Sequence, residues 1–229
     1  MSKLVWDATG TRFYETGVSK GVLYTQKADG TYNTGVAWNG LTGVSESPDG
    51  AEPNDLYADN IKYASLRSAE TFGCTIEAYT YPDEFAECDG SYAAASGVHI
   101  GQQPRKAFGF CYRTEVGNDT MTESDDGYKL HIIYNCTASP SEKSYETIND
   151  SPDAITFSWE VTTTPVEVGV EGVKPTATII IDSTKLTEQA KTYLATLEGI
   201  LYGGANSDPT LPDPKTVISY MTTGAAPTP

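Results

Sequence analysis

The sequence TFGCTIEAYTYPDEFAECDG, residues 71–90, changes its structural period halfway, and this change decides the expected fold. In its first half, apolar residues alternate with small or polar ones, the apolar positions being Phe72, Cys74, Ile76 and Ala78. A two-residue period is typical of a strand that buries one of its faces. The first half therefore predicts a half-buried β-strand.

The second half of this stretch predicts a short helix. Pro82 has a fixed φ and no backbone N–H, so it suits the first turn of a helix better than a central strand. Asp83, Glu84 and Glu87 place negative charge near the helix N-terminus, where the helix dipole favours it. The Asp-Gly dipeptide at residues 89–90 is a turn signal. We expect a strand, a corner, a short helix and a return to strand.

Composition favours a soluble β-protein with an acidic surface. The chain has 229 residues and a formal net charge of −16. Thr, Tyr, Val and Gly are abundant, which favours strands and turns over helical bundles. An acidic chain is not expected to bind nucleic acid nonspecifically, since that binding needs a positive surface. No apolar run long enough to span a membrane and no signal peptide is evident.

The four cysteines are expected to be free thiols without metal. Cys74, Cys88, Cys111 and Cys136 form no CxxC pair, and the two histidines stand far apart in the sequence. A zinc site is therefore not predicted. Asp119, Asp125 and Asp126 could hold calcium in a loop, but the EF-hand spacing is missing.

Further alternating segments extend the β-fold over most of the chain. Residues 11–26 predict a strand with a bulge at a glycine, and residues 106–116 and 128–136 predict a hairpin. Residues 154–164 predict a strand whose buried face includes Ile155, and the apolar run at 176–182 predicts a strand buried on both faces. His131 falls on the polar face of its strand, so we expect a surface or interface residue.

Polar and helical segments complete a single expected domain, residues 1–229. Residues 45–59 are rich in polar residues, Pro and Gly, and predict a long loop. Thr187 can cap a helix over about residues 187–202, and Asp213-Pro214 can open one last helical turn. Residues 224–229, GAAPTP, predict a flexible end.

Nothing in the sequence forms a recognisable catalytic or cofactor-binding pattern. The densest acidic group, Glu77 with the carboxylates at 83, 84 and 87, is explained by its position at a helix start. No nucleophile elbow accompanies the histidines, and no glycine-rich phosphate loop occurs. We therefore expect a non-enzyme without cofactor or metal.

Six segments, taken in chain order, resemble the major tail tube proteins of long-tailed phages of Gram-positive bacteria. They are GVSKGVLY (17–24), GVAWNGLTGVSESPDGAEPNDLYADNIKYA (35–64), YTYPDEFAECDG (79–90), KAFGFCYRTEVGND (106–119), YKLHIIYNCTASPSEKSYETIND (128–150) and FSWEVTTTP (157–165). From residue 184 onward the similarity is looser. Several long segments in register are far more specific than any single motif.

The resemblance implies a fold and a function. The expected fold is mainly β, a β-sandwich or half-barrel with a short helix after the fourth strand region and a C-terminal helix. Copies would join edge to edge into hexameric rings that stack into a hollow tail tube for genome delivery. The acidic wall would repel the passing DNA. Because the sequence ends at GAAPTP, an added immunoglobulin-like domain for host-surface decoration is not expected.

The resemblance also implies partners and a location. Besides itself, the chain would meet the tape measure, distal tail and tail terminator proteins, and no membrane. Assembly would take place in the host cytoplasm, and the product would be the virion tail. We expect the loop at 45–59 to contact the next ring, through Ser47, Asp49, Glu52, Asn54, Asp55 and Tyr57.

Two other functions stay open. One is a secreted β-sandwich carbohydrate-binding module or adhesin, in which tyrosines and tryptophans would line a sugar site. The other is a β-sandwich hydrolase with two facing carboxylates. The missing signal peptide weighs against the first, and the missing convergent site against the second.

Overall fold

The structure is a computed structural model, and it describes residues 3–50, 52–120, 127–145, 147–148, 153–205 and 207–227. The strands are β1 (Phe13–Thr25), β2 (Val36–Trp38), β3 (Leu41–Glu46), β4 (Asp49–Gly50), β5 (Pro53–Ala58), β6 (Ile61–Arg67), β7 (Glu70–Thr71), β8 (Gly73–Ala78), β9 (Tyr92–Ala95), β10 (Val98–Ile100), β11 (Phe108–Asn118), β12 (Gly127–Ala138), β13 (Phe157–Thr163) and β14 (Thr178–Asp182). Two α-helices, α1 (Glu188–Leu201) and α2 (Pro214–Thr223), follow the last strand, and the 3₁₀ turns are η1 (Asp83–Glu87) and η2 (Ser183–Lys185).

One antiparallel sheet forms the body, in the order β2-β1-β11-β12-β13-β8-β3, with β14 also paired to β12. The sheet divides at β12, which pairs with β14 through Lys129–Ile133 and with β13 through Cys136–Ala138. Between these two parts, Asn135 has φ 49°, and the β11–β12 register shifts nearby. This bend lets β13, β8 and β3 fold back over β1 and β11, and β1 and β3 come into contact. The mainly β sandwich or half-barrel predicted from the sequence is confirmed.

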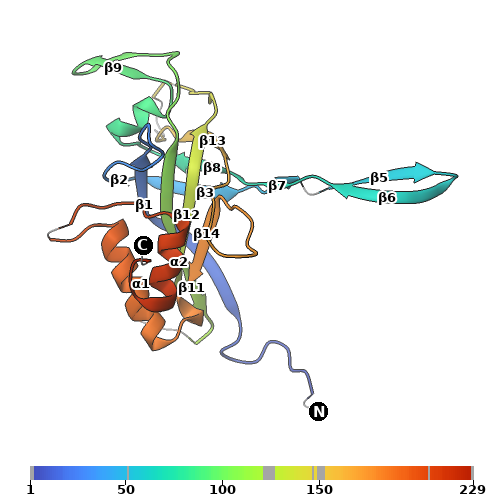
Figure 1. The fold of residues 1–229 in the computed structure, drawn as a ribbon. Helices are drawn as coiled ribbons and strands as arrows, with labels where there is room; N and C mark the ends of the chain where they lie inside the picture. The colour runs from blue at the N-terminus through green and yellow to red at the C-terminus, as the bar shows by residue number, and fades with distance from the viewer. Residues whose placement is uncertain are drawn as a thin grey trace.

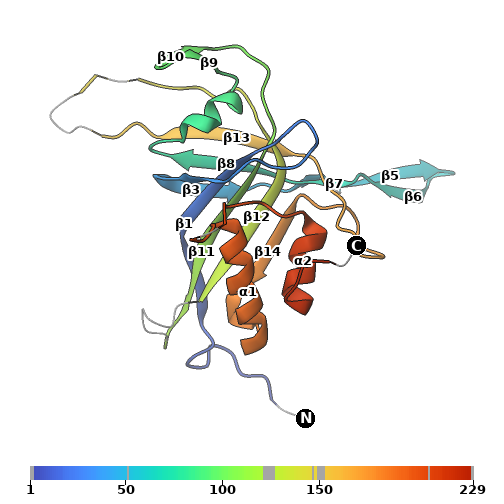
Figure 2. The same cartoon turned by 60° about the vertical axis from the view of Figure 1, so that its left-hand side comes forward.

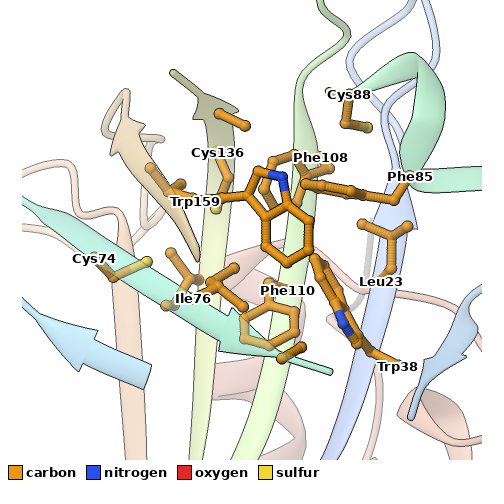
Figure 3. Close-up of a cluster of buried hydrophobic side chains, with 14 of the residues drawn as sticks. Leu23, Trp38, Cys74, Ile76, Phe85, Cys88, Phe108, Phe110, Cys136 and Trp159 are labelled. Atoms are coloured by element: carbon orange, nitrogen blue, oxygen red, sulfur yellow. The ribbon is translucent and has the colours of Figure 1, made fainter. Parts of the chain in front are cut away.

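The first half of residues 71–90 lies at the centre of the core between these two layers. Cys74, Ile76 and Ala78 of β8 are buried as predicted, and the chain then turns into η1. Phe85 of η1 is fully buried, with its ring centroid 4.6 Å from that of Trp38 and 5.1 Å from that of Trp159 (Figure 3). The short helix after the strand therefore delivers an aromatic side chain into the middle of the sandwich.

The second core lies between the outer face of the β1–β11–β12–β14 layer and the two helices (Figure 2). Leu194, Leu197 and Leu201 form the buried face of α1. The hydroxyl of Tyr24 on β1 donates to the carbonyl of Leu201 at 2.6 Å, which ties the helix end to the sheet. Thr187 caps α1 by accepting from the N–H of Ala190, so the predicted C-terminal helix is confirmed.

Several local predictions are confirmed. The β11–β12 hairpin buries Phe110 and Tyr112 on one face and Cys111 on the other, and the β1–β11 register shifts twice between Thr16 and Val22, around Gly17. The predicted last turn at Asp213-Pro214 is a full helix, α2, which ends at Gly224 with φ 76°. Residues 228–229 of the expected flexible end lie outside the described residues.

Two predictions about apolar strands are wrong. Ile180 of β14 is 47% exposed, because β14 pairs only with β12 and only its Ile179 and Ile181 side face the helices. Ile155 lies outside β13, which starts at Phe157, and is 38% exposed. Ile180 thus points away from the helices on the uncovered face of its strand, whereas Ile155 precedes the strand to which it was assigned.

Candidate assembly interface

The described residues between 41 and 78 form one long β-hairpin, half of which leaves the body. At its base β3 pairs with β8, and Ser47 and Gly73 then exchange backbone hydrogen bonds. Beyond that point β4 pairs with β7, and β5 pairs with β6. Figure 1 and Figure 2 show the β5–β6 part extending away from the sandwich. We call residues 53–67, β5 and β6 with their turn, the arm.

The predicted loop at residues 45–59 is therefore wrong as a description of structure. These residues complete β3 and form β4 and β5 of the hairpin. Their polar and Pro-rich composition resembles that of a loop because these strands do not pack against a hydrophobic core of the subunit. The chain turns at Asp59 and Asn60, whose φ angles are 50° and 65°. Two successive positive φ angles match the two-residue turn of a twisted hairpin, and Asp and Asn tolerate them better than most residues.

The arm has one apolar face that no described part of its own subunit covers. Directly opposed residues of an antiparallel pair lie on the same face, and here Leu56 opposes Ala64 while Ala58 opposes Ile61. Leu66 belongs to the same face, since it opposes Asn54 two residues before Leu56. The exposed fractions are 42% for Leu56, 65% for Ile61 and 56% for Leu66. We call this the apolar face of the arm.

The opposite face of the arm, which we call the polar face, carries paired polar side chains together with the exposed ring of Tyr57. The Lys62 ammonium lies 2.8 Å from the Asp55 carboxylate, and the Ser65 hydroxyl donates to the same carboxylate at 2.7 Å. The hydrogen bonds from Lys62 and Ser65 lower the pKa of Asp55. These cross-strand contacts fix the pairing of the arm while leaving its apolar face uncovered.

The six residues predicted to contact a next ring all lie on the outer hairpin or at its root. Ser47 is at the root, Asp49 belongs to β4, Glu52 precedes the arm, and the rest are on β5, namely Asn54, Asp55 and Tyr57. Asp55 and Tyr57 occupy the polar face. Of the predicted residues in the arm, only Asn54, which opposes Leu66, lies on the apolar face. The prediction missed the apolar side chains themselves, although the alternation of Leu56 and Ala58 and the apolar Ile61, Ala64 and Leu66 are visible in the sequence.

At the root of the hairpin, a cluster of polar side chains joins it to the β1–β11–β12 layer. His131 Nδ1 lies 3.0 Å from Glu46 Oε1, and the Tyr112 hydroxyl donates to the same oxygen at 2.8 Å. The imidazole is stacked on the Tyr112 ring with 4.6 Å between centroids. The hydrogen bond from His131 is the main cause that lowers the pKa of Glu46, with a further contribution from Tyr112.

The same cluster continues to β1 through Thr114 and Glu15. Thr114 Oγ1 lies 3.1 Å from His131 Nε2 and 2.7 Å from Glu15 Oε1, and Lys129 Nζ lies 2.5 Å from Glu15 Oε2. Burial alone would raise the pKa of Glu15, but the hydrogen bonds from Lys129 and Thr114 outweigh it and lower that pKa. His131 is only 6% exposed, so its predicted surface position is wrong. Tyr112 and Glu46, from other strands, cover it.

Two further groups of exposed apolar side chains lie outside the arm. A second hairpin, β9–β10, projects from the body near η1 (Figure 1) and exposes Tyr92, Val98 and Ile100. Before β1, the chain exposes Leu4, Val5 and Trp6 in succession. Projecting apolar groups of this kind are typical of surfaces that partners cover.

The described residues offer little for metal or acid–base chemistry. Within them, no group of three or more His, Cys, Asp or Glu side chains could hold a metal ion. The suggested calcium loop cannot be assessed, because Asp125 and Asp126 lie outside the described residues. A groove between β1, β12 and η2 contains Glu15 and Asp182, and each carboxylate is paired with a lysine, Lys129 and Lys185. In that groove both carboxylates therefore form ion pairs with lysines.

The cysteines and the helices show no further features of a functional site in the described part of the chain. All four cysteines are free and buried, as predicted. None of the described helices has the length and apolar character needed to cross a bilayer.

Comparison with known proteins gives one family. A family model described as phage tail tube protein matches residues 13–202. Among solved structures, the chain is similar to one described as a cryo-EM structure of the anti-feeding prophage baseplate, 6-fold symmetrised, with 8% identity and a TM-score of 0.35. That match covers 80% of this chain and 100% of the other. None of the curated protein sequences matches.

Proposed function

The chain belongs to the phage tail tube protein family, and from this premise we propose that copies of it join into hexameric rings that stack through the arm into a hollow tube. As a member of this family it is a structural protein of the phage tail, located in the virion tail. The proposal adds how copies meet and what the tube does. Its origin in long-tailed phages of Gram-positive bacteria stays a prediction.

One observation supports the proposal most, namely the uncovered apolar face of the arm. A two-stranded hairpin is marginally stable alone in water. The arm exposes Leu56, Ile61 and Leu66 on a face against which another chain could pack. Covering these three side chains would stabilise both the arm and the contact, at about 1.5–3 kcal/mol for each fully buried side chain. A second copy of the chain is the partner that a self-assembling tube protein always has beside it.

The strand edges of the body suit side-by-side joining within a ring. Among the described residues, β14 and β3 each pair with one strand only, so each has an unpaired edge there, and β2 covers only Gly21–Leu23 of β1. Free edges invite pairing with another chain, and a closed ring removes them. We propose that a ring uses such edges while the arm bridges successive rings.

The charge of the chain supports its use as a conduit. With a net charge of −16 per copy, a tube would repel DNA phosphates and let the genome pass without sticking. Purified protein should not retain double-stranded DNA on a filter even at low salt. The tape measure, distal tail and tail terminator proteins stay predicted partners, and assembly in the host cytoplasm stays a predicted location.

The arm variant Ile61→Asp tests the proposal. It places a charge on the apolar face without touching the body, so the subunit should fold while tubes disappear from negative-stain images and size-exclusion profiles. Val173→Asp is a matched control, since Val173 is an exposed valine outside the arm. Tubes of normal length formed by Ile61→Asp would contradict the proposal. A monomeric parent protein that binds sugar would favour the carbohydrate-binding alternative instead.

A further inference from the structure

We propose that His131 is a positioning residue for the arm, because it holds Glu46 at the point where the hairpin leaves the body. The hairpin direction is then set by this polar contact together with the packing of Val44 and Phe72 against the core. The relevance of this contact to assembly rests on the function proposed above. The contact itself is a property of one subunit.

Glu46 stands at the last position of β3 before the hairpin becomes free-standing. It opposes Cys74 of β8, and the next pair, Ser47 with Gly73, is the last rung before β4 and β7. From there outward the described strands pair only as two-stranded ladders, β4 with β7 and β5 with β6. A change in orientation at Glu46 therefore passes to the whole outer hairpin.

The two strands of the hairpin are held at this point from two sides. On the β8 side, the Thr163 hydroxyl of β13 donates to the Phe72 carbonyl at 2.6 Å. On the β3 side, Glu46 accepts from His131 and Tyr112. Glu46 is thus the link between the hairpin root and the β11–β12 strands of the opposite layer.

A small rotation at the root of the hairpin produces a large displacement at its turn. Residues 47 to 59 span about 40 Å when each residue of a strand adds about 3.3 Å. With a lever of that length, a rotation of about 10° at the root moves the turn by about 7 Å. A specific contact between copies tolerates a much smaller displacement than this. A loosely held root would therefore weaken assembly even if the apolar face is intact.

Both ring nitrogens of His131 have a partner within hydrogen-bonding distance. Nδ1 lies 3.0 Å from Glu46 Oε1, and Nε2 lies 3.1 Å from Thr114 Oγ1, whose hydroxyl donates to Glu15 Oε1 at 2.7 Å. Lys129 pairs with the other oxygen of Glu15. The imidazole is therefore held from both sides, which fixes the position at which it meets Glu46.

The experiment measures the arm direction directly in the unassembled subunit. Spin labels are placed on the arm and on α1 through Tyr63→Cys and Ala195→Cys, both at exposed positions, and the four native thiols are buried. The distance distribution between the labels is recorded for the parent and for Glu46→Ala, Glu46→Gln, His131→Phe and Tyr112→Phe. Glu70→Ala is the control, because Glu70 is an exposed carboxylate on β7 outside the cluster.

A narrow distribution is expected for the parent, the control and Tyr112→Phe, and at least a twofold broader one for Glu46→Ala and His131→Phe. Glu46→Gln, which keeps an acceptor oxygen, should recover a narrow distribution. If Glu46→Ala stays narrow, or if Tyr112→Phe broadens the distribution as much as Glu46→Ala does, the assignment to His131 is overturned. If His131→Phe does not fold, the widths of the distance distributions of Glu46→Ala and Tyr112→Phe are compared instead, and this comparison still tests the assignment.

This measurement also separates the two proposals. It needs no assembly, so a broad distribution in Glu46→Ala supports the positioning role even when Ile61→Asp still forms tubes. Tubes lost in Ile61→Asp together with an unchanged distribution in Glu46→Ala would support the arm contact and overturn the positioning role.

Discussion

Ser47 and Gly73 exchange two backbone hydrogen bonds, of 2.8 and 3.2 Å, where one continuous hairpin passes from the core of the body to the projecting arm. On the inner side of this pair, Cys74 and Ile76 are buried. On the outer side, Leu56 and Ile61 are exposed. The inner half of the hairpin thus contributes to folding, and its outer half is free to contact a partner. Variants in the inner half should therefore lower the stability of the subunit, whereas variants in the outer half should impair assembly.

Phe85→Ala should strongly destabilise the subunit. The ring is fully buried against Trp38, Trp159 and Phe108, and its removal leaves a cavity that the surrounding rings cannot fill. Removing such a ring costs about 3–5 kcal/mol, measured as the free energy of unfolding in urea. Tyr79→Ala, an exposed aromatic of the same segment, should change it by less than about 0.5 kcal/mol. Equal losses in both variants would show that η1 does not close the core.

Much of the body could be predicted from sequence because its signals are local. The alternation before Ala78, the proline at 82 and the two faces of residues 106–136 each depend on neighbours within a few positions. The Thr187 cap and the leucine spacing of α1 are local in the same way. Such patterns state which face is buried without any knowledge of the partner layer.

The arm and its root could not be predicted because their partners are distant or absent. The composition of residues 45–59 predicts a loop, and only the pairing of Pro53–Ala58 with Ile61–Arg67 shows that they belong to a hairpin. The burial of His131 depends on Glu46, which lies 85 positions away in the sequence. No local period carries information about a contact of that range.

Acid should destabilise the subunit through Glu15 and Glu46. Both carboxyls have a pKa below the ordinary value of 4.5 in the folded chain, so their contribution is complete above about pH 4.5 and is lost as the pH falls through the lowered pKa. Urea unfolding measured at decreasing pH should show this loss. In Glu46→Gln the acid-dependent loss should be smaller, whereas Glu70→Gln should retain the parent's. An identical pH dependence in Glu46→Gln would contradict the assignment.

The four thiols should be unreactive in the folded protein. Burial raises the pKa of Cys74, Cys88 and Cys111 to about 12, and it also raises that of Cys136. Because the thiolate is the reactive form, a disulfide reagent should modify none of them at neutral pH until the chain is unfolded, and then all four. The surface variant Ala195→Cys should react at once as a control. Rapid modification of a native thiol would show that its strand opens locally.

Removing the arm should leave a folded subunit that no longer forms tubes. Replacing Pro53–Arg67 with an Asn-Gly turn closes the hairpin near β4 and β7 and deletes no residue of either core cluster. A change in loop length of this size costs about 1 kcal/mol, which corresponds to about 2–4 °C in melting temperature for a chain of this length. Tubes should disappear, while replacing only Asp59-Asn60 with Asn-Gly, which keeps both strands, should preserve them. If the shortened chain unfolds, the arm contributes to the fold of one subunit. If it still forms tubes, copies meet through other surfaces, because the deletion removes every side chain of the apolar face at once.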